Sequence, residues 1–341
     1  MWEVKNMTPF AAAGYFVRDR DGAEHWAIAA RARFSLSPDD FPCITDQLPV
    51  RLSPEYSDDA ALELKAEADL TPFRPHPDII LRGSVWPPSD GAHSRLLALR
   101  IGPMEKLVAA FSKRHARRQN GKWRVTTERF TPFALSWRYA LGGRDVLAAP
   151  DTPDSLHPGN PIGVGWSPRM GAAPDETECQ LPRLERPKAL LHPDKPPPLP
   201  AGFGPLQPGW QPRLARAGTY DDAWREERAP LPPTDFSEAF HQAAPDDQIY
   251  RQALRGGEPV ELDGFHPDGV LSFQLPQIIL AARTRICGVD IDSRLRIVAV
   301  EIDGTARTLD IVWNMAVPCP GGDHLVERTT ILLRQMAGVA R

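Results

Sequence analysis

The amino-acid sequence predicts a mainly β protein: an antiparallel, two-sheet, sandwich-like fold with long proline-rich loops and a few short helices. Apolar and polar residues alternate over many short stretches, which is the pattern of a strand with one buried face. Asp-Gly and Asn-Gly dipeptides, which favour tight turns, separate several of these stretches. The chain also contains 37 prolines, which disfavour long helices and favour loops and sheet edges.

The clearest predicted strand covers residues 24–36. Apolar side chains occupy every second position from Trp26 to Leu36, and the opposite, solvent-facing side carries Arg31 and Arg33. The dipeptide Asp21-Gly22 comes directly before it, so a strand through residues 14–18 completes a hairpin.

The rest of the chain repeats this pattern as an antiparallel meander of short strands joined by turns. In the N-terminal part the predicted strands are 78–86, 95–101, 106–112, 122–129 and 133–141. In the C-terminal part they are 259–265, 270–275, 283–291, 295–302, 307–317 and 324–333.

We expect one domain over residues 1–341, built from two β-rich parts of about 1–149 and 201–341. A proline-rich segment, residues 150–200, joins them, and about half of all prolines lie between Pro150 and Pro233. Within it, residues 188–200 favour extended polyproline geometry.

The charge balance is nearly even, with 40 Lys plus Arg against 44 Asp plus Glu. No global field therefore attracts nucleic acid or anionic lipid, and we expect neither as a partner. The start of the chain has no basic and apolar leader pattern, so we expect a cytoplasmic protein. Four scattered cysteines without metal-ligand spacing predict reduced thiols, no metal and no cofactor.

Residues 210–247 combine large aromatic side chains with prolines and acidic residues, so we expect an ordered loop and not a linker. After the prolines that end at Pro233, Asp235 is placed to cap a short helix that begins at Phe236. A second short helix is predicted from Asp246 or Asp247 to Gly256.

Several motifs in this loop occur in a fixed order. They are Trp210-x-Pro212-Arg213, Gly218-Thr219-Tyr220-Asp221-x-x-Trp224, Leu231-Pro232-x-x-Asp235-Phe236 and Ala243-Ala244-Pro245-x-x-Gln248. Further blocks are Asn6-x-Thr8-Pro9-Phe10, Asp69-Leu70-x-Pro72, Asn160-Pro161-x-Gly163-x-Gly165 and Leu254-Arg255-Gly256-Gly257-Glu258. Together they resemble, over nearly the whole chain, a bacterial family known as domain of unknown function 2169.

The resemblance implies an adaptor or chaperone of type VI secretion that binds a secreted effector and loads it onto a VgrG or PAAR spike protein. It implies a stoichiometric role without catalytic residues. The signature residues, which are also the partner-binding candidates, are Trp210, Arg213, Tyr220, Asp221, Trp224, Asp235 and Phe236.

Other functions remain open at this point. Asp221, Asp235 and Glu258 offer carboxylates for a hydrolase, in particular a carbohydrate-active one. A glycine-rich stretch, residues 159–165, suggests a phosphate loop, although Pro161 favours a tight structural turn. The basic run 113–124 lies across a predicted hairpin tip and is solvated or binds an acidic protein, with nucleic acid the least favoured partner.

Overall fold

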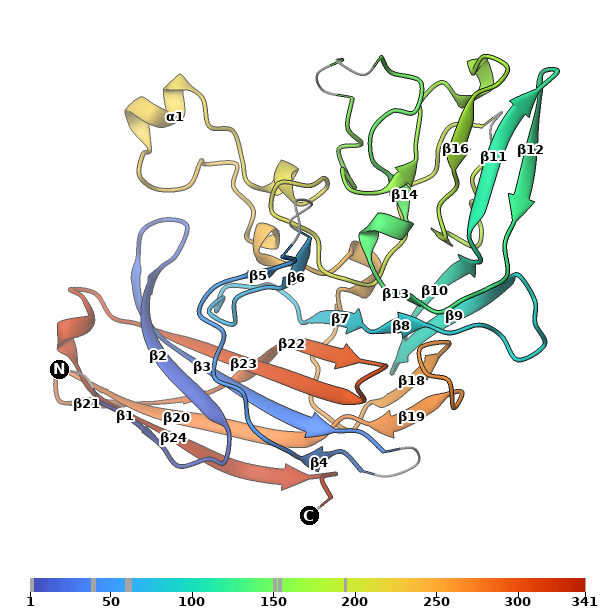
Figure 1. Cartoon of the computed structure of the whole chain (residues 1–341). Helices are drawn as coiled ribbons and strands as arrows, with labels where there is room; N and C mark the ends of the chain where they lie inside the picture. The colour runs from blue at the N-terminus through green and yellow to red at the C-terminus, as the bar shows by residue number, and fades with distance from the viewer. Residues whose placement is uncertain are drawn as a thin grey trace.

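A computed structural model describes residues 3–37, 41–58, 63–149, 152, 155–192 and 195–340. Strands dominate, which confirms the mainly β prediction. Two sheets lie face to face in the lower part of Figure 1, a third sheet continues the molecule beside them, and a small hairpin sheet and a short helix project above. No helix of the described residues has the length and apolar character needed to span a membrane.

The first large sheet combines strands from both ends of the chain, because β3 pairs antiparallel with β23 over its whole length. Its order is β2-β3-β23-β22-β7, and β4 pairs with β3 outside this path. The strands are β2 (Ala11–Arg18), β3 (Glu24–Ser35), β23 (Thr308–Pro318), β22 (Arg296–Asp303), β7 (Asp78–Arg82) and β4 (Cys43–Ile44).

The second sheet packs against the first and has the order β1-β24-β20-β21. It contains β1 (Glu3–Asn6), β24 (Val326–Ala337), β20 (Gln277–Ile286) and β21 (Val289–Arg294). The fully buried Trp26 of β3 lies between the two sheets and donates a hydrogen bond from Nε1 to the Thr329 hydroxyl at 2.9 Å. This contact shows the sandwich arrangement that the alternating sequence pattern predicts.

The third sheet has the order β17-β10-β9-β18-β19. Its strands are β17 (Leu184–Glu185), β10 (Met104–Phe111), β9 (Ser94–Ile101), β18 (Pro259–Asp263) and β19 (Leu271–Gln274). Its buried residues Leu99 and Val260 belong to the same apolar cluster as Trp26 and Trp313, so one continuous core joins all three sheets.

The remaining elements are short. A three-stranded sheet contains β12 (Lys122–Thr127), β11 (Arg114–Gln119) and β16 (Glu178–Gln180). Pairs form between β5 (Glu55–Tyr56) and β6 (Leu64–Ala66), β8 (Ser84–Val85) and β13 (Phe133–Ala134), and β14 (Leu141–Gly142) and β15 (Val164–Gly165). The described residues contain α1 (Asp222–Glu227) and 3-10 helices at Trp137–Tyr139, Met170–Ala172, Leu214–Arg216, Glu238–His241, Asp246–Gln248 and Asp323–Leu325.

Three predicted strands are wrong. The stretch 78–86 divides at Gly83, whose φ is 124°, into β7 and β8, and these two strands belong to different sheets. The stretch 133–141 breaks into β13, a 3-10 helix and β14, because the Ser136 side chain caps the helix and the Glu63 carboxylate accepts hydrogen bonds from Ser136 and from the Trp137 amide. The stretch 283–291 contains a turn, in which Cys287 and Gly288 adopt positive φ angles of 47° and 78° between β20 and β21.

The helices observed near residue 240 also differ from the predicted ones. Ser237 caps the helix at Glu238–His241, and the second helix shrinks to Asp246–Gln248. The α1 helix has no counterpart in the sequence prediction. Of the proline-rich stretch 188–200, residues 193 and 194 lie outside the described residues.

Candidate partner-binding site

The base of the segment 210–247 packs against the body of the protein. The Trp210 side chain is buried, and its ring meets the Trp137 ring edge to face at 6.3 Å. Arg213 is buried as well and donates hydrogen bonds to the Phe240 and Leu206 carbonyls at 2.8 Å and to the Glu67 carboxylate at 2.6 Å. A buried guanidinium is costly without such partners, so these contacts fix the position of the base.

Phe236 completes this packed base. Its side chain is buried, and its ring contacts the rings of Phe240 at 5.8 Å and His241 at 5.6 Å. Burial, together with the nearby Arg74 and Arg213, lowers the pKa of His241 to about 4. The His241 imidazole is therefore neutral at pH 7. Because their side chains are buried, Trp210, Arg213 and Phe236 form a scaffold within the molecule.

The middle of the segment, residues 214–233, projects from the body, and we call it the arm (Figure 1). Tyr220 is 55% exposed, and its ring meets the half-buried Trp224 edge to face at 4.6 Å. Trp224 Nε1 donates a hydrogen bond to the Leu231 carbonyl at 2.8 Å, while the Asp221 carboxylate accepts one from the Trp224 amide at 2.8 Å and so caps α1. The arm thus presents an aromatic pair on an ordered support.

Asp235 ties the two ends of the arm together. Its carboxylate accepts hydrogen bonds from the Thr219 amide at 3.0 Å and the Thr219 hydroxyl at 2.9 Å, which lower the pKa of Asp235. The predicted role of Asp235 as cap of a helix starting at Phe236 is therefore wrong, since Ser237 caps that helix. The carboxylate instead closes the loop around Gly218, whose φ of 83° is in the left-handed region.

The arm also contacts the turn between β2 and β3. Arg228 pairs with the Asp21 carboxylate at 2.9 Å and donates to the Arg20 carbonyl at 3.0 Å. Arg20 in return donates to the Thr234 carbonyl at 2.7 Å. These polar contacts join residues more than 200 positions apart and hold the arm in one orientation.

A cavity of about 590 Å³ lies beside the base of the arm. Separate parts of the chain meet there, and the lining includes Trp137, Pro158, Leu206, Pro212 and Pro245. Such a lining is predominantly apolar, and its volume is in the range of sites that take an apolar ligand group or a large side chain.

Lys106 is the buried cation of this cavity. Its Nζ donates hydrogen bonds to the Gly202 carbonyl at 2.5 Å, the Gln248 side chain at 2.6 Å and the Asp247 carboxylate at 2.7 Å, which uses all three donors. Burial lowers the pKa of Lys106 to about 8, although Asp247 opposes this change. The sequence prediction missed Lys106, and its signal was a lysine on the inward face of a strand, in phase with Val108 and Ala110.

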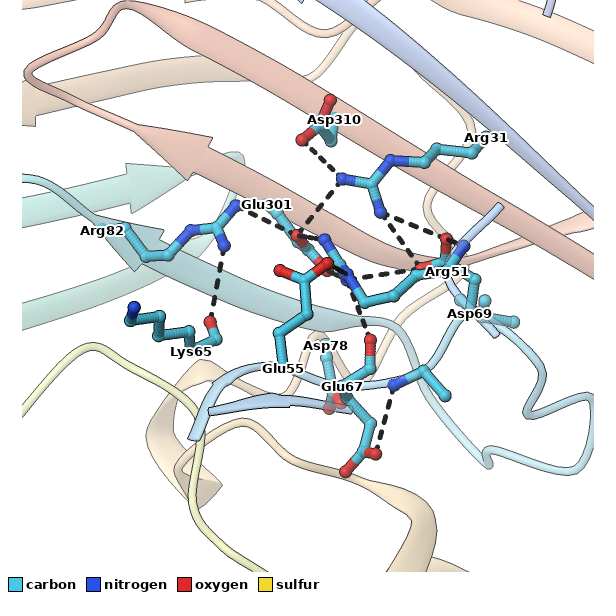
Figure 2. Close-up of polar contacts among 12 residues, drawn as sticks. Arg31, Arg51, Glu55, Lys65, Glu67, Asp69, Asp78, Arg82, Glu301 and Asp310 are labelled. Carbon is cyan, nitrogen blue, oxygen red and sulfur yellow. Dashed lines mark hydrogen bonds and ion pairs between the residues drawn. The ribbon is translucent and has the colours of Figure 1, made fainter. Parts of the chain in front are cut away.

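A network of buried charges lies on the face of the first sheet that points away from the second sheet (Figure 2). Arg31 contacts Asp69 at 3.1 Å and Asp310 at 2.7 Å, and Arg51 contacts Glu301 at 2.9 Å. The prediction that Arg31 faces solvent is wrong, because its side chain is 1% exposed. The segment containing Arg51 and Asp69 covers this face of the sheet, which the strand pattern alone does not reveal.

One protein-family model matches residues 21–314, and its description is an uncharacterized protein conserved in bacteria, DUF2169. The chain belongs to the DUF2169 family. This match confirms the family resemblance that the sequence motifs indicate. No curated protein and no solved structure gives a significant match to the chain.

The carboxylates of the hydrolase hypothesis have local partners in this DUF2169 protein. Asp221 caps α1, Asp235 binds Thr219, and Glu258 accepts a hydrogen bond from the Arg255 amide at 2.9 Å ahead of β18. Hydrolysis stays a prediction of the sequence. Among the described residues, no group of three or more His, Cys, Asp or Glu side chains is arranged to hold a metal ion.

The glycine-rich stretch 159–165 forms a tight turn in this DUF2169 protein. The buried Asn160 side chain donates to the Trp137 and Leu141 carbonyls at 2.8 and 2.9 Å. A Cβ atom on Gly163 would lie 2.6 Å from the Ala140 carbonyl oxygen. The glycine is therefore required by close backbone packing.

Proposed function

We propose that this DUF2169 protein is an adaptor that binds a type VI secretion effector in the cytoplasm and presents it to a VgrG or PAAR spike protein. The secretion role rests on the motif resemblance described above. The observation that best supports an adaptor is the arm, which projects from the body with Tyr220 exposed on an ordered support.

The arm suits partner binding because association through it loses little conformational entropy. Tyrosine supplies a large contact area at low conformational cost, and a preordered loop loses less freedom when a partner binds. Contacts at both ends, through Arg228 to Asp21 and through Asp235 to Thr219, preorder the arm. In this proposal Tyr220 is the first contact for the effector, and Trp224 supports it.

The cavity supports the same function, since it lies at the base of the arm between Trp137 and Pro245. A bulky apolar side chain of the effector would fill it and remove apolar surface from water, at about 25 cal/mol per Å² buried. One effector would then contact the arm and the cavity together.

The test is co-expression with the proteins encoded on either side of the gene, followed by affinity pull-down and size-exclusion chromatography. We expect a stable complex with a toxin-like neighbour whose solubility falls when the adaptor is absent. Hydrolysis of a glycan by the isolated protein, with no neighbour bound, would replace the adaptor with the hydrolase.

Two matched variants assign the contact surface. Tyr220→Ala removes a side chain that is 55% exposed, and we expect at least a tenfold loss of effector affinity with an unchanged urea midpoint. Val289→Ala removes an exposed side chain on the distant strand β21 and should change neither property. Equal effector binding by both variants would move the contact away from the arm.

A further inference from the structure

The outer edge of β12 is free for pairing. β12 is the terminal strand of the three-stranded sheet β12-β11-β16, and its hairpin with β11 projects from the body (Figure 1). The Glu128 amide donates to the Lys113 carbonyl at 2.9 Å, which sets the alternation of this antiparallel pair. The backbone groups of Trp123, Val125 and Thr127 therefore point outward, and no backbone hydrogen bond within the described part of the chain reaches them.

The two faces of this edge differ in chemistry. Lys122 and Arg124 share one face, and neither forms an ion pair with any residue that the structure describes. Trp123 and Val125 share the other face, where Val125 is 52% exposed. Cations and apolar side chains thus alternate along a strand whose outer edge is unpaired.

The inner edge of the same hairpin already shows which chemistry fits. There β16 pairs with β11 and places Glu178 opposite Arg117, with an ion pair at 3.3 Å. The next residue, Cys179, lies opposite Ala116 and is buried with it. On this edge of the hairpin, the chain itself adds a strand, β16, in which an acidic residue is followed by an apolar residue.

We infer that the outer edge of β12 binds an extended segment of a partner protein as an additional antiparallel strand. The segment alternates acidic residues, which lie opposite Lys122 and Arg124, with apolar residues, which lie opposite Trp123 and Val125. Antiparallel pairing with a second copy of β12 about Arg124 is disfavoured because it would place this cation against its own copy. This surface is separate from the arm, so the inference holds whether or not the protein is an adaptor.

The probe is an acetylated and amidated seven-residue peptide of alternating glutamate and valine, compared with the same peptide of lysine and valine. Binding to the full chain is measured by fluorescence anisotropy, and the bound site by amide hydrogen exchange. We expect at least tenfold tighter binding of the glutamate peptide. We also expect new exchange protection at the amides of Trp123, Val125 and Thr127.

Substitutions in β12 separate backbone pairing from charge. Val125→Pro removes an outward N–H without removing a bond to β11, so binding should fall at least tenfold, whereas Val125→Thr keeps the N–H and should bind normally. The pair Lys122→Glu and Arg124→Glu should reverse the preference toward the lysine peptide.

Several results would overturn the inference. These are equal binding of both peptides, protection confined to another strand, or full binding by a folded Val125→Pro variant. Dimerisation of the chain through β12 in sedimentation experiments would assign the edge to a second copy. If Val125→Pro does not fold, the charge-reversed variant decides by its peptide preference alone.

Discussion

Replacing Glu301 by Gln tests how strongly the buried charge network stabilises the fold. Glu301 is buried, and its carboxylate accepts hydrogen bonds from Arg51 at 2.9 and 3.2 Å and from Arg82 at 3.1 Å. Burial raises the pKa of Glu301, but the guanidinium groups of Arg51, Arg82 and Arg31 together outweigh burial and hold it at about 2 instead of 4.5. This lowering corresponds to about 3 kcal/mol of folding free energy.

The direction in which stability depends on pH follows from the lowered pKa of Glu301. Because the unfolded chain binds the proton of Glu301 more tightly, the stabilisation is fully present above pH 4.5 and is lost as the pH falls toward 2. The free energies of unfolding of wild type and Glu301→Gln should differ by about 3 kcal/mol at pH 7 and by about 1 kcal/mol at pH 3. Urea unfolding followed by tryptophan fluorescence at both pH values measures this difference.

Glu261 provides the matched control. Its side chain is 43% exposed and pairs with Arg100 on the surface of the third sheet, so Glu261→Gln should leave the urea midpoint unchanged at both pH values. A difference for Glu301→Gln that stays constant between pH 7 and pH 3, or that is below about 1 kcal/mol at pH 7, would refute the assigned role of its carboxylate.

Three further predictions use the same unfolding assay or the folded yield. Arg213→Met should cost about 3–5 kcal/mol because it leaves Glu67 without its buried partner, whereas Arg216→Met breaks a more exposed ion pair and should cost less than about 1 kcal/mol. The pKa of Lys106 is lowered to about 8 from 10.5, so between these pH values the folded state binds fewer protons than the unfolded chain. The free energy of unfolding of the wild type should therefore rise by up to about 3 kcal/mol from pH 8 to pH 10.5, and Lys106→Met should lack this increase. Gly143→Ala should lower the soluble yield, because φ is 78° and the new Cβ would lie 2.1 Å from the Gly163 carbonyl oxygen, while Gly209→Ala meets no atom within 4 Å and should express normally.

The sequence predicted strands best where one face is apolar and a turn dipeptide lies next to the strand. The stretch 24–36 becomes β3, and the Asn120-Gly121 turn has positive φ angles of 51° and 73° at the tip of the β11–β12 hairpin. Prediction failed at 133–141, where hydrogen bonds from Ser136 and the Trp137 amide to the distant Glu63 carboxylate select a 3-10 helix. Long-range polar contacts of this kind leave no period in the local sequence.

The candidate site was likewise predicted from the sequence only in part. The aromatic content of residues 210–247 showed that this loop is ordered, but it did not separate the buried Trp210 from the exposed Tyr220. Lys106 was missed because a single lysine does not break the strand pattern, although its inward phase was readable. Its position in the cavity depends on Asp247 and Gln248, which lie about 140 residues away.

By itself the sequence determined the fold class, the turns and the family, because alternation, turn dipeptides and ordered motifs are properties of neighbouring residues. Tertiary structure alone decided which surfaces are free. Arg31 stands at a position that reads as solvent-facing, yet the segment containing Arg51 and Asp69 covers it and pairs it with Asp69. Lys122 and Arg124 read as the same kind of surface charge, and both remain exposed on the edge strand of the three-stranded sheet. Burial depends on which distant segments meet, and that is settled only when the whole chain packs around one core.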